Sequence, residues 1–434
     1  MGTCDRLSSS RRSFLRTGAL GGLSLSLADY LRRQAAGDVS ARHTADAAIF
    51  ISLQGGPSHL DMFDMKPDAP AEYRGEFSPI DTSIAGFRVC QHLPHLAQCA
   101  GRFSVIRSVA HNLADHSLGQ QYVVTGNRPA AGTDYPGLGA LAIKERGAIA
   151  PDLPPFVAIP DTAQRGGYLG VGYSPLETQA QPTPRSPLKV RGISLANGVL
   201  PAEIAKRDKL RRELDRGLER LADEDELLHG LDEFSERALT IIMSDKTSEA
   251  FDLPKESPSF AAPFGATGFG LSCLAALRLV ERGVRFVTLT NPGWDTHGNN
   301  FTTLKRTLLP DFDQGLAALL NGLHERGLLE KTAIVVTGEF GRTPRINSGA
   351  GRDHFPQAMT VVMAGGGITG GRVFGATDEL GMAPVDFACS PGDIAASFLN
   401  SLGIDHHKEN TTNTGRPLRL VGVGRVIPEL FESQ

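Results

Sequence analysis

The stretch "VRFVTLTNPGWDTHGNNFTTLKRTLLPDFDQGLAALLNGLHERGLLEKTAIVVTGEFG", residues 284–341, contains one complete strand–helix–strand unit of the predicted fold. It starts with an apolar, β-branched run at 284–291 and passes through a polar loop into a helical pattern at 309–331. A second apolar run, 332–341, ends in another polar loop. A strand, a covering helix and a second strand in this order are typical of parallel neighbours in a sheet.

The same alternation extends through most of the chain. Further strands are predicted at 47–53, 102–109, 154–160 and 359–367, and further helices at 268–283 and 390–404. We therefore predict an α/β fold, a three-layer α/β/α sandwich with a mostly parallel central sheet. The glycine-rich stretch 364–371 precedes another short strand rather than a helix, so no dinucleotide-binding loop is predicted.

Composition and charge narrow the possible partners. The chain has 434 residues, 41% of them hydrophobic, which is enough for one large core or two ordinary ones. Its formal net charge is −4 and its pI is about 6.3. No strongly basic surface is indicated, so nucleic acid is not expected as a partner.

The N-terminus contains an export pattern. Residues 9–27, "SSRRSFLRTGALGGLSLSL", pair Arg11 and Arg12 with Phe14 and Leu15 before a short, weakly apolar stretch. This order is typical of a bacterial twin-arginine signal, although a basic amphipathic helix is the alternative. We expect residues 1–40 to be signal peptide and linker, and the protein to be periplasmic or secreted, with membrane contact only through the signal.

The middle of the chain differs from the rest. Residues 201–234 are highly charged, with apolar residues at helical spacing and opposite charges three and four apart. We predict a single domain over 45–431 with a helical insertion at about 200–250, which could cover a site or bind a partner. Two cysteines of the domain, Cys90 and Cys99, could form a disulfide in an exported protein.

Polar clusters follow or precede several predicted strands. In a parallel α/β sheet, ligands bind at the carboxyl ends of the strands. Such positions are occupied here by carboxylates and imidazoles: His59, Asp61, His111, Asp115, His116, Asp295, His297, Glu339, Asp353 and His354. This set of side chains suits zinc, manganese or a similar divalent ion, which could polarise an ester oxygen.

Each of these residues also has a structural interpretation. Asp295 could cap a helix that begins near Asn299, and Asp61 could cap a turn. Glu339 could form an ion pair with Arg342 or Arg345. The residues alone do not choose between these interpretations and a metal site.

The motifs resemble a known family. "GGPSHLDMFDMKPDAP" (55–70), "GWDTHGNNF" (293–301), "GEFGRTPRIN" (338–347) and "GRDHFPQAMTVVMAGGG" (351–367) are similar to those of the domain-of-unknown-function 1501 family, which consists of twin-arginine-exported bacterial proteins. The resemblance covers residues 47–431. That family resembles, more distantly, the alkaline phosphatase/sulfatase superfamily of three-layer α/β/α proteins, whose members use one or two metal ions to cleave phosphate and sulfate esters.

The resemblance implies roles for individual residues. It places Asp295, His297, Glu339 and His354 among the metal ligands, and Asp353, Asp61 and His59 are further candidates. Phe340 stands where a second ligand histidine would be, so we predict one divalent ion, with Zn, Mn and Ca not distinguished. The usual nucleophile position falls on His116, with Ser117 next to it, and Arg342 or Arg345 could bind the anionic group.

The sequence thus predicts an exported metal-dependent hydrolase of sulfate or phosphate esters, acting on a small anionic ester or a sulfated glycan. One alternative is a catalytically inactive exported protein of the same fold that docks a partner or glycan. Another is a carbohydrate-modifying enzyme that uses different chemistry at the same site. The oligomeric state is left open.

Overall fold

The computed structural model describes residues 45–178, 180–185, 188, 244–412 and 414–431. The chain divides into two units, Met1–Arg42 and His43–Gln434, and the described residues belong to the second. The predicted signal and linker, 1–40, lie outside the described residues. So does most of the predicted insertion at 200–250; its last residues lie in the helix α9 (Asp245–Phe251).

An eight-stranded sheet forms the centre of the domain. Its strand order is β12-β4-β11-β8-β1-β7-β5-β6. All of its strands run in one direction except β11, which is antiparallel to both of its neighbours. The strands span Val373–Phe374 (β12), Phe103–Val109 (β4), Met359–Ala364 (β11), Thr332–Thr337 (β8), Ala47–Leu53 (β1), Phe286–Asn291 (β7), Phe156–Ile159 (β5) and Leu176–Glu177 (β6).

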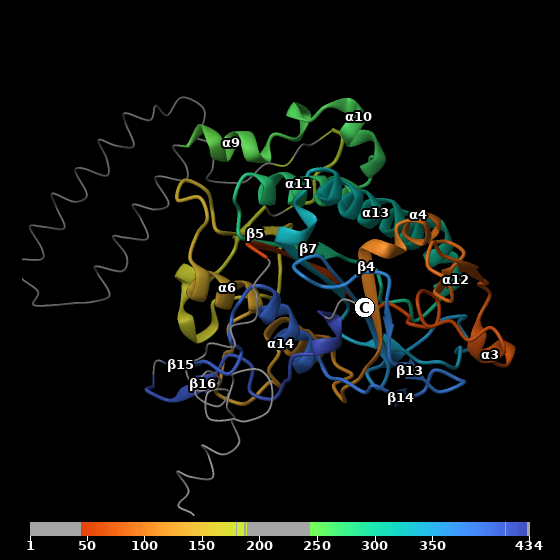
Figure 1. Ribbon diagram of the computed structural model, residues 1–434. Helices are drawn as coiled ribbons and strands as arrows, with labels where there is room; N and C mark the ends of the chain where they lie inside the picture. The colour runs from red at the N-terminus through yellow and green to blue at the C-terminus, as the bar shows by residue number, and fades with distance from the viewer. Residues whose placement is uncertain (1–44, 179, 186–187, 189–243, 413, 432–434) are drawn as a thin grey trace, which may run out of the picture. The chain divides into compact units, whose positions relative to one another are not determined.

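Helices cover both faces of this sheet (Figure 1). Successive side chains of a strand point to opposite faces, so in β1 Ile49 and Ile51 join one apolar core while Ala48 and Phe50 join the other. The first core includes α4 (Pro94–Gln98), α11 (Gly268–Glu281), α12 (Asn300–Thr303) and α13 (Leu309–Glu325). The second includes α5 (His116–Thr125), α6 (Leu138–Arg146) and α14 (Pro391–Ser401). The predicted α/β class, with helices on both faces of a mostly parallel sheet, is confirmed.

Local signals fix where the helices begin. Ser390 and Asp393 form a capping box at the start of α14. The carboxylate of Asp115 accepts a hydrogen bond from the backbone N–H of Leu118 at 3.0 Å, so α5 begins at His116. Gly126, in the left-handed conformation with φ 69°, ends that helix. These caps place His116 in the first turn of α5.

Shorter elements complete the described part of the domain. They are α3 (Ala71–Arg74), α10 (Pro258–Ala261) and the two-stranded pairs β2 (Pro79–Asp81) with β3 (Arg88–Cys90), β9 (Gly341–Arg342) with β10 (His354–Phe355), β13 (Ala376–Thr377) with β14 (Pro384–Asp386) and β15 (Glu409–Thr411) with β16 (Pro417–Arg419). Among the described helices, none combines the length and the apolar character that crossing a membrane requires.

The cysteines of the domain are buried free thiols. Cys90 and Cys99, which could have formed a disulfide, are not joined. Burial raises the pKa of the Cys90 thiol to about 12 and that of the Cys99 thiol to about 11. Both thiols therefore stay protonated at neutral pH and pack as small apolar groups.

Candidate metal centre

The direction of β11 explains how the polar clusters meet. Asp295 follows β7 and Glu339 follows β8, at the carboxyl ends of two strands that flank β1. Because β11 runs the opposite way, the residues before it, Asp353 and His354, reach the same edge. The start of α5 contributes His116 there after β4. Loops separated by more than 200 residues in the sequence thus meet at one edge of the sheet.

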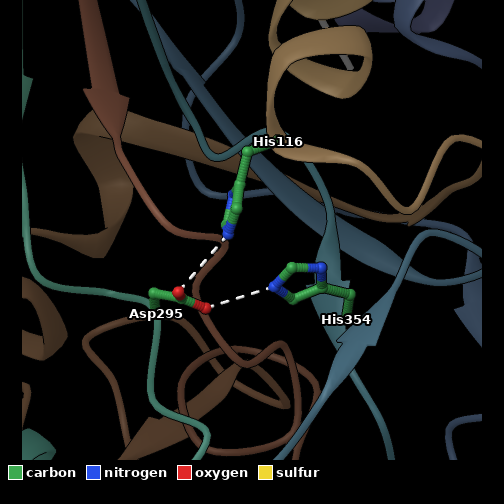
Figure 2. Close-up of side chains that lie close together, drawn as sticks. All are labelled: His116, Asp295 and His354. Atoms are coloured by element: carbon green, nitrogen blue, oxygen red, sulfur yellow. Dashed lines mark hydrogen bonds and ion pairs between the residues drawn. The ribbon is translucent and has the colours of Figure 1, made fainter.

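Asp295 lies at the centre of three imidazole rings. Figure 2 shows two of them, with each carboxylate oxygen facing a different ring. Oδ1 of Asp295 lies 3.2 Å from Nε2 of His354 and 3.1 Å from Nε2 of His297. Oδ2 lies 3.4 Å from Nε2 of His116. The potential ligand atoms of His116, Asp295 and His354 all lie within 4.8 Å of one another.

Each of the three rings is held at its other nitrogen by an oxygen acceptor. Nδ1 of His116 lies 2.5 Å from Oε1 of Glu339, and Nδ1 of His297 lies 2.7 Å from Oδ1 of Asp353. Nδ1 of His354 lies 2.8 Å from the carbonyl oxygen of Ala114. Because these oxygens only accept, the network assigns the proton to Nδ1 in every ring.

The rings therefore present unprotonated Nε2 atoms to Asp295 when they are neutral. Nε2 of His297 and Nε2 of His354 lie only 3.0 Å apart. Two lone pairs at this distance repel each other unless a cation, either a proton or a metal ion, lies between them. Imidazoles that donate Nδ1–H to a carboxylate or carbonyl and aim Nε2 at a common point are the usual arrangement of metal-binding histidines.

Glu339 holds His116 and a neighbouring loop. Its side chain is only 2% exposed, and its oxygens accept the backbone N–H of Gly55 at 2.9 and 3.2 Å as well as the ring of His116. Gly55 has φ 116°, and a Cβ there would lie 2.3 Å from the backbone nitrogen of Asp295. The predicted ligand Glu339 thus occupies an orienting position behind the ring of His116.

Arg342 is enclosed by the protein, although it was predicted to bind substrate. It donates from Nε to the carbonyl of Gly56 at 2.9 Å and from Nη1 to the carbonyl of Arg352 at 3.0 Å. Nη2 donates to the carbonyl of Gly55 and, at 2.5 Å, to Oδ1 of Asp295. With no exposed surface, its guanidinium orients Asp295 and is not available to a substrate.

The pKa of Asp295 reflects this contact. Partial burial acts to raise it, but the hydrogen bond and the charge of Arg342 outweigh burial. The result is a pKa of about 2. Asp295 is therefore a carboxylate at any physiological pH, as a metal ligand must be.

Asp61 and His59, two further predicted ligands, lie outside this cluster. Both oxygens of Asp61 are taken by protein donors: Arg352 at 2.8 and 3.1 Å and the amide of Asn300 at 2.9 Å. Nε2 of His59 donates to the carbonyl of Gly381 at 2.9 Å, and burial lowers the pKa of this ring. Both side chains are fully buried, so their positions serve the fold rather than a shared ion.

The remaining predicted residues surround the cluster. Ser117 is exposed, and its hydroxyl accepts a hydrogen bond from the amide of Gln121 at 3.4 Å instead of contacting Asp295. Arg345 is exposed. The Phe340 ring packs against the rings of His116 and His354, with centroids 5.0 and 4.5 Å apart, and excludes solvent from one side of them.

Some site residues gave no signal in the sequence. Ala114 acts through its carbonyl, which any residue could supply. Asn347 donates from Nδ2 to Oδ1 of Asp353 at 3.2 Å and to the carbonyl of His297 at 3.0 Å. The stretch "NSGAG" at 347–351 is a recognisable turn sequence, but it does not reveal that the turn touches a histidine.

The fold and the cluster together define an α/β protein with a histidine- and carboxylate-lined site at the carboxyl edge of its central sheet. The chain belongs to the family described as "Protein of unknown function (DUF1501)", whose model matches residues 45–431. The predicted family membership is confirmed. A search of curated proteins finds no match.

Several solved structures are similar to this chain. A putative sulfatase from Bacteroides thetaiotaomicron shows a TM-score of 0.40 at 10% identity, over 90% of this chain and 75% of the other. The PsFucS1 sulfatase from Pseudoalteromonas sp. shows 0.35 at 11% identity, over 86% and 70%. The phosphonate monoester hydrolase SpPMH from Silicibacter pomeroyi shows 0.32 at 13% identity, over 89% and 76%. The strand order and the contacts above, and not these distant likenesses, define the site.

Proposed function

We propose that this protein is an exported metal-dependent hydrolase of sulfate or phosphate esters, acting on a small anionic ester or a sulfated glycan. The observation that carries the proposal is the convergence of three ring nitrogens on the carboxylate of Asp295. The substrate class comes from the resemblance of the motifs to the alkaline phosphatase/sulfatase superfamily. The export rests on the twin-arginine pattern at 9–27.

The donor atoms fit a single divalent ion. Oδ1 of Asp295 and Nε2 of His297 and His354 form a triangle with sides of 3.0–3.2 Å. Around an ion with bonds of about 2.0–2.1 Å, neighbouring ligands lie about 3.0–3.4 Å apart. Two imidazoles and one carboxylate would hold the ion and leave positions for substrate. When bound, the ion would supply a Lewis acid that polarises the ester oxygen.

The charge of the site also favours a cation. Three carboxylates, those of Asp295, Glu339 and Asp353, contact the rings, and one guanidinium, that of Arg342, contacts Asp295. With neutral rings the cluster carries an excess of two negative charges, which a divalent ion would balance. An anionic substrate would be repelled by the cluster without the ion.

We assign to His116 the role of general base or nucleophile. Its Nδ1–H is held by Glu339, which fixes the ring and leaves Nε2 free to accept a proton or to attack. Nε2 faces the second oxygen of Asp295, on the same side as the proposed ion. Ser117 has no comparable contact. Arg345, which is exposed, remains the candidate for holding the anionic group of the substrate.

The proposal is tested by a screen of aryl sulfates, phosphomonoesters and phosphodiesters with zinc, manganese or calcium. We expect turnover of one ester class that depends on added ion. We expect Glu339→Gln to reduce turnover about 10- to 100-fold, because the ring of His116 loses its charged partner. His324→Ala, an exposed histidine on α13, is the matched control and should keep wild-type turnover.

Two results would count against the proposal. Inertness toward all three ester classes with every ion would favour the alternative, an exported binding protein of the same fold. Equal turnover in Glu339→Gln and wild type would remove the Glu339–His116 contact from the mechanism.

A further inference from the structure

We propose that Asn347 is a positioning residue that fixes the contact between Asp353 and His297 and so strengthens ion binding. This inference builds on the proposed function, because it concerns the same ion. Asn347 does not touch the three donor atoms. It acts on His297 from behind, through the carboxylate that holds the ring.

The side chain of Asn347 uses its two polar atoms in opposite directions. Nδ2 donates to Oδ1 of Asp353 at 3.2 Å and to the carbonyl of His297 at 3.0 Å. Oδ1 accepts from the backbone N–H of Gly349 at 2.9 Å and of Gly351 at 3.0 Å. Each half faces only partners of the right kind, so the orientation of the amide is unambiguous.

The amide oxygen and the amide nitrogen of Asn347 have different structural roles. The oxygen closes the turn of residues 347–351, and the nitrogen joins that turn to the loop of His297. Oδ1 of Asp353 receives both the Nδ1–H of His297 and the amide of Asn347. Asp353 is about half exposed, with its side chain at 51%, and a carboxylate this exposed would otherwise have several orientations.

The backbone keeps the two loops in one arrangement. Asn299 donates its N–H to the carbonyl of Gly349, and Asn300 donates to that of Ala350, both at 3.0 Å. Asn299 and Ala350 have φ values of 52° and 51°, a left-handed conformation that costs energy in residues other than glycine. A Cβ on Gly351 would lie 2.0 Å from the carbonyl oxygen of His297, so the loops approach as closely as glycine allows.

The contacts predict what each polar atom of Asn347 contributes. Without the Nδ2 donor, Asp353 keeps its charge but loses the contact that aims it at the ring. The Nδ1–H of His297 is then held less firmly, and its Nε2 is less fixed beside Asp295. Removing the direct partner of a metal-binding histidine typically lowers ion affinity about 10- to 100-fold. That partner is Asp353 here, so loosening it through Asn347 should cost up to about 10-fold.

Three variants separate the possible roles. Asn347→Asp keeps an oxygen acceptor for the N–H groups of Gly349 and Gly351 but replaces the donor with an oxygen that faces the Asp353 carboxylate. Asn347→Ala removes both. Ser348→Asp adds the same negative charge to the same exposed turn while leaving Asn347 intact, so it is the charge-matched control for Asn347→Asp.

Two measurements are made on the full-length protein. The first is the NMR signal of the His297 Nδ1–H proton without added ion, with histidine-labelled protein. The second is the zinc dissociation constant, from competition with a chelator. We expect Asn347→Asp to shift or broaden the ring-proton signal and to weaken zinc binding about 10-fold relative to Ser348→Asp.

Other outcomes would overturn the inference. If Asn347→Asp matches Ser348→Asp in both measurements, the donor has no positioning role. If only Asn347→Ala weakens zinc binding, the residue merely closes its turn. If the wild type binds no zinc, the proposed metal site fails, and the ring-proton signal alone decides the role of Asn347.

Discussion

Asp61 and Arg352 form an ion pair that is completely buried, with Oδ2 of Asp61 2.8 Å from Nε of Arg352. Arg352 also donates to the carbonyls of Tyr73, Thr343 and Pro344. The pair therefore ties the loop after β1 to the loop that carries Asp353 and His354. A carboxylate near the carboxyl edge of the sheet is therefore easily predicted from the sequence to be a metal ligand. In the fold, the charge of this one is already balanced by an arginine.

Asp61→Ala should damage folding and not ion binding alone. Removing one partner leaves a buried guanidinium without its counter-charge, which costs about 3–5 kcal/mol of unfolding free energy. Urea denaturation of metal-free protein measures this. Asp68→Ala removes an exposed carboxylate from the same segment and should change stability by no more than about 0.5 kcal/mol. A loss in Asp61→Ala no larger than in the control would contradict the structural role.

The carboxyl group of Asp295 should make stability depend on pH in acid. The fold lowers its pKa from the ordinary value of 3.8 to about 2. The unfolded chain therefore takes up the proton first, so the stabilising contact with Arg342 is complete above about pH 4 and is lost as pH falls toward 2. Thermal denaturation of the metal-free proteins measures this loss. Between pH 4.5 and pH 3, Asp295→Asn should lose less stability than wild type. Parallel curves for the two proteins would contradict this assignment.

At the level of elements, α14 depends on its capping box. Ser390 accepts from the N–H of Asp393, and the Asp393 carboxylate accepts from the N–H and hydroxyl of Ser390. We expect Ser390→Ala to reduce the unfolding free energy by about 1 kcal/mol, because the N–H of Asp393 loses its acceptor and the Asp393 carboxylate loses the hydroxyl donor. Ser248→Ala, an exposed serine within α9, is the comparison and should be nearly neutral. Urea midpoints of the two variants test the difference.

Elements were the most predictable part of the molecule. The apolar run 47–53 matches β1 residue for residue, and 284–291, 332–341 and 359–367 contain β7, β8 and β11. These strands are buried on both faces, so their sequences are continuous apolar runs that are easy to recognise. The direction of β11 was not predictable, because a run such as "MTVVMA" pairs equally well in either direction.

The sequence predicted which residues gather at the site. It did not predict which of them face the centre of the site and which hold the rings from behind. Asp295, His297, Glu339 and His354 meet as their positions at strand ends suggested. Which atoms face inward depends on partners that the sequence does not reveal, such as the carbonyl of Ala114. For this reason Glu339 and Asp353, both candidate ligands, lie behind the rings instead of among the inward-facing atoms.

The whole molecule should become more stable when the ion binds. An ion that binds only the folded state adds about 2.7 kcal/mol when its free concentration is 100 times the dissociation constant. We expect zinc to raise the melting temperature of metal-free wild type by a few degrees and a chelator to reverse the change. His354→Ala should lose the response, whereas His324→Ala should keep it. An equal response in both variants would place the ion elsewhere.

The orientation of β11 has a consequence for how the chain tolerates length changes. The segment before this strand carries His354, whereas the glycine-rich turn after it, 365–371, emerges at the opposite rim of the sheet. Extra residues engineered into that turn would lengthen the polypeptide far from the rings. The same number engineered at 347–351 would displace them, so a scanning library of insertions should retain ion binding on one rim and lose it on the other.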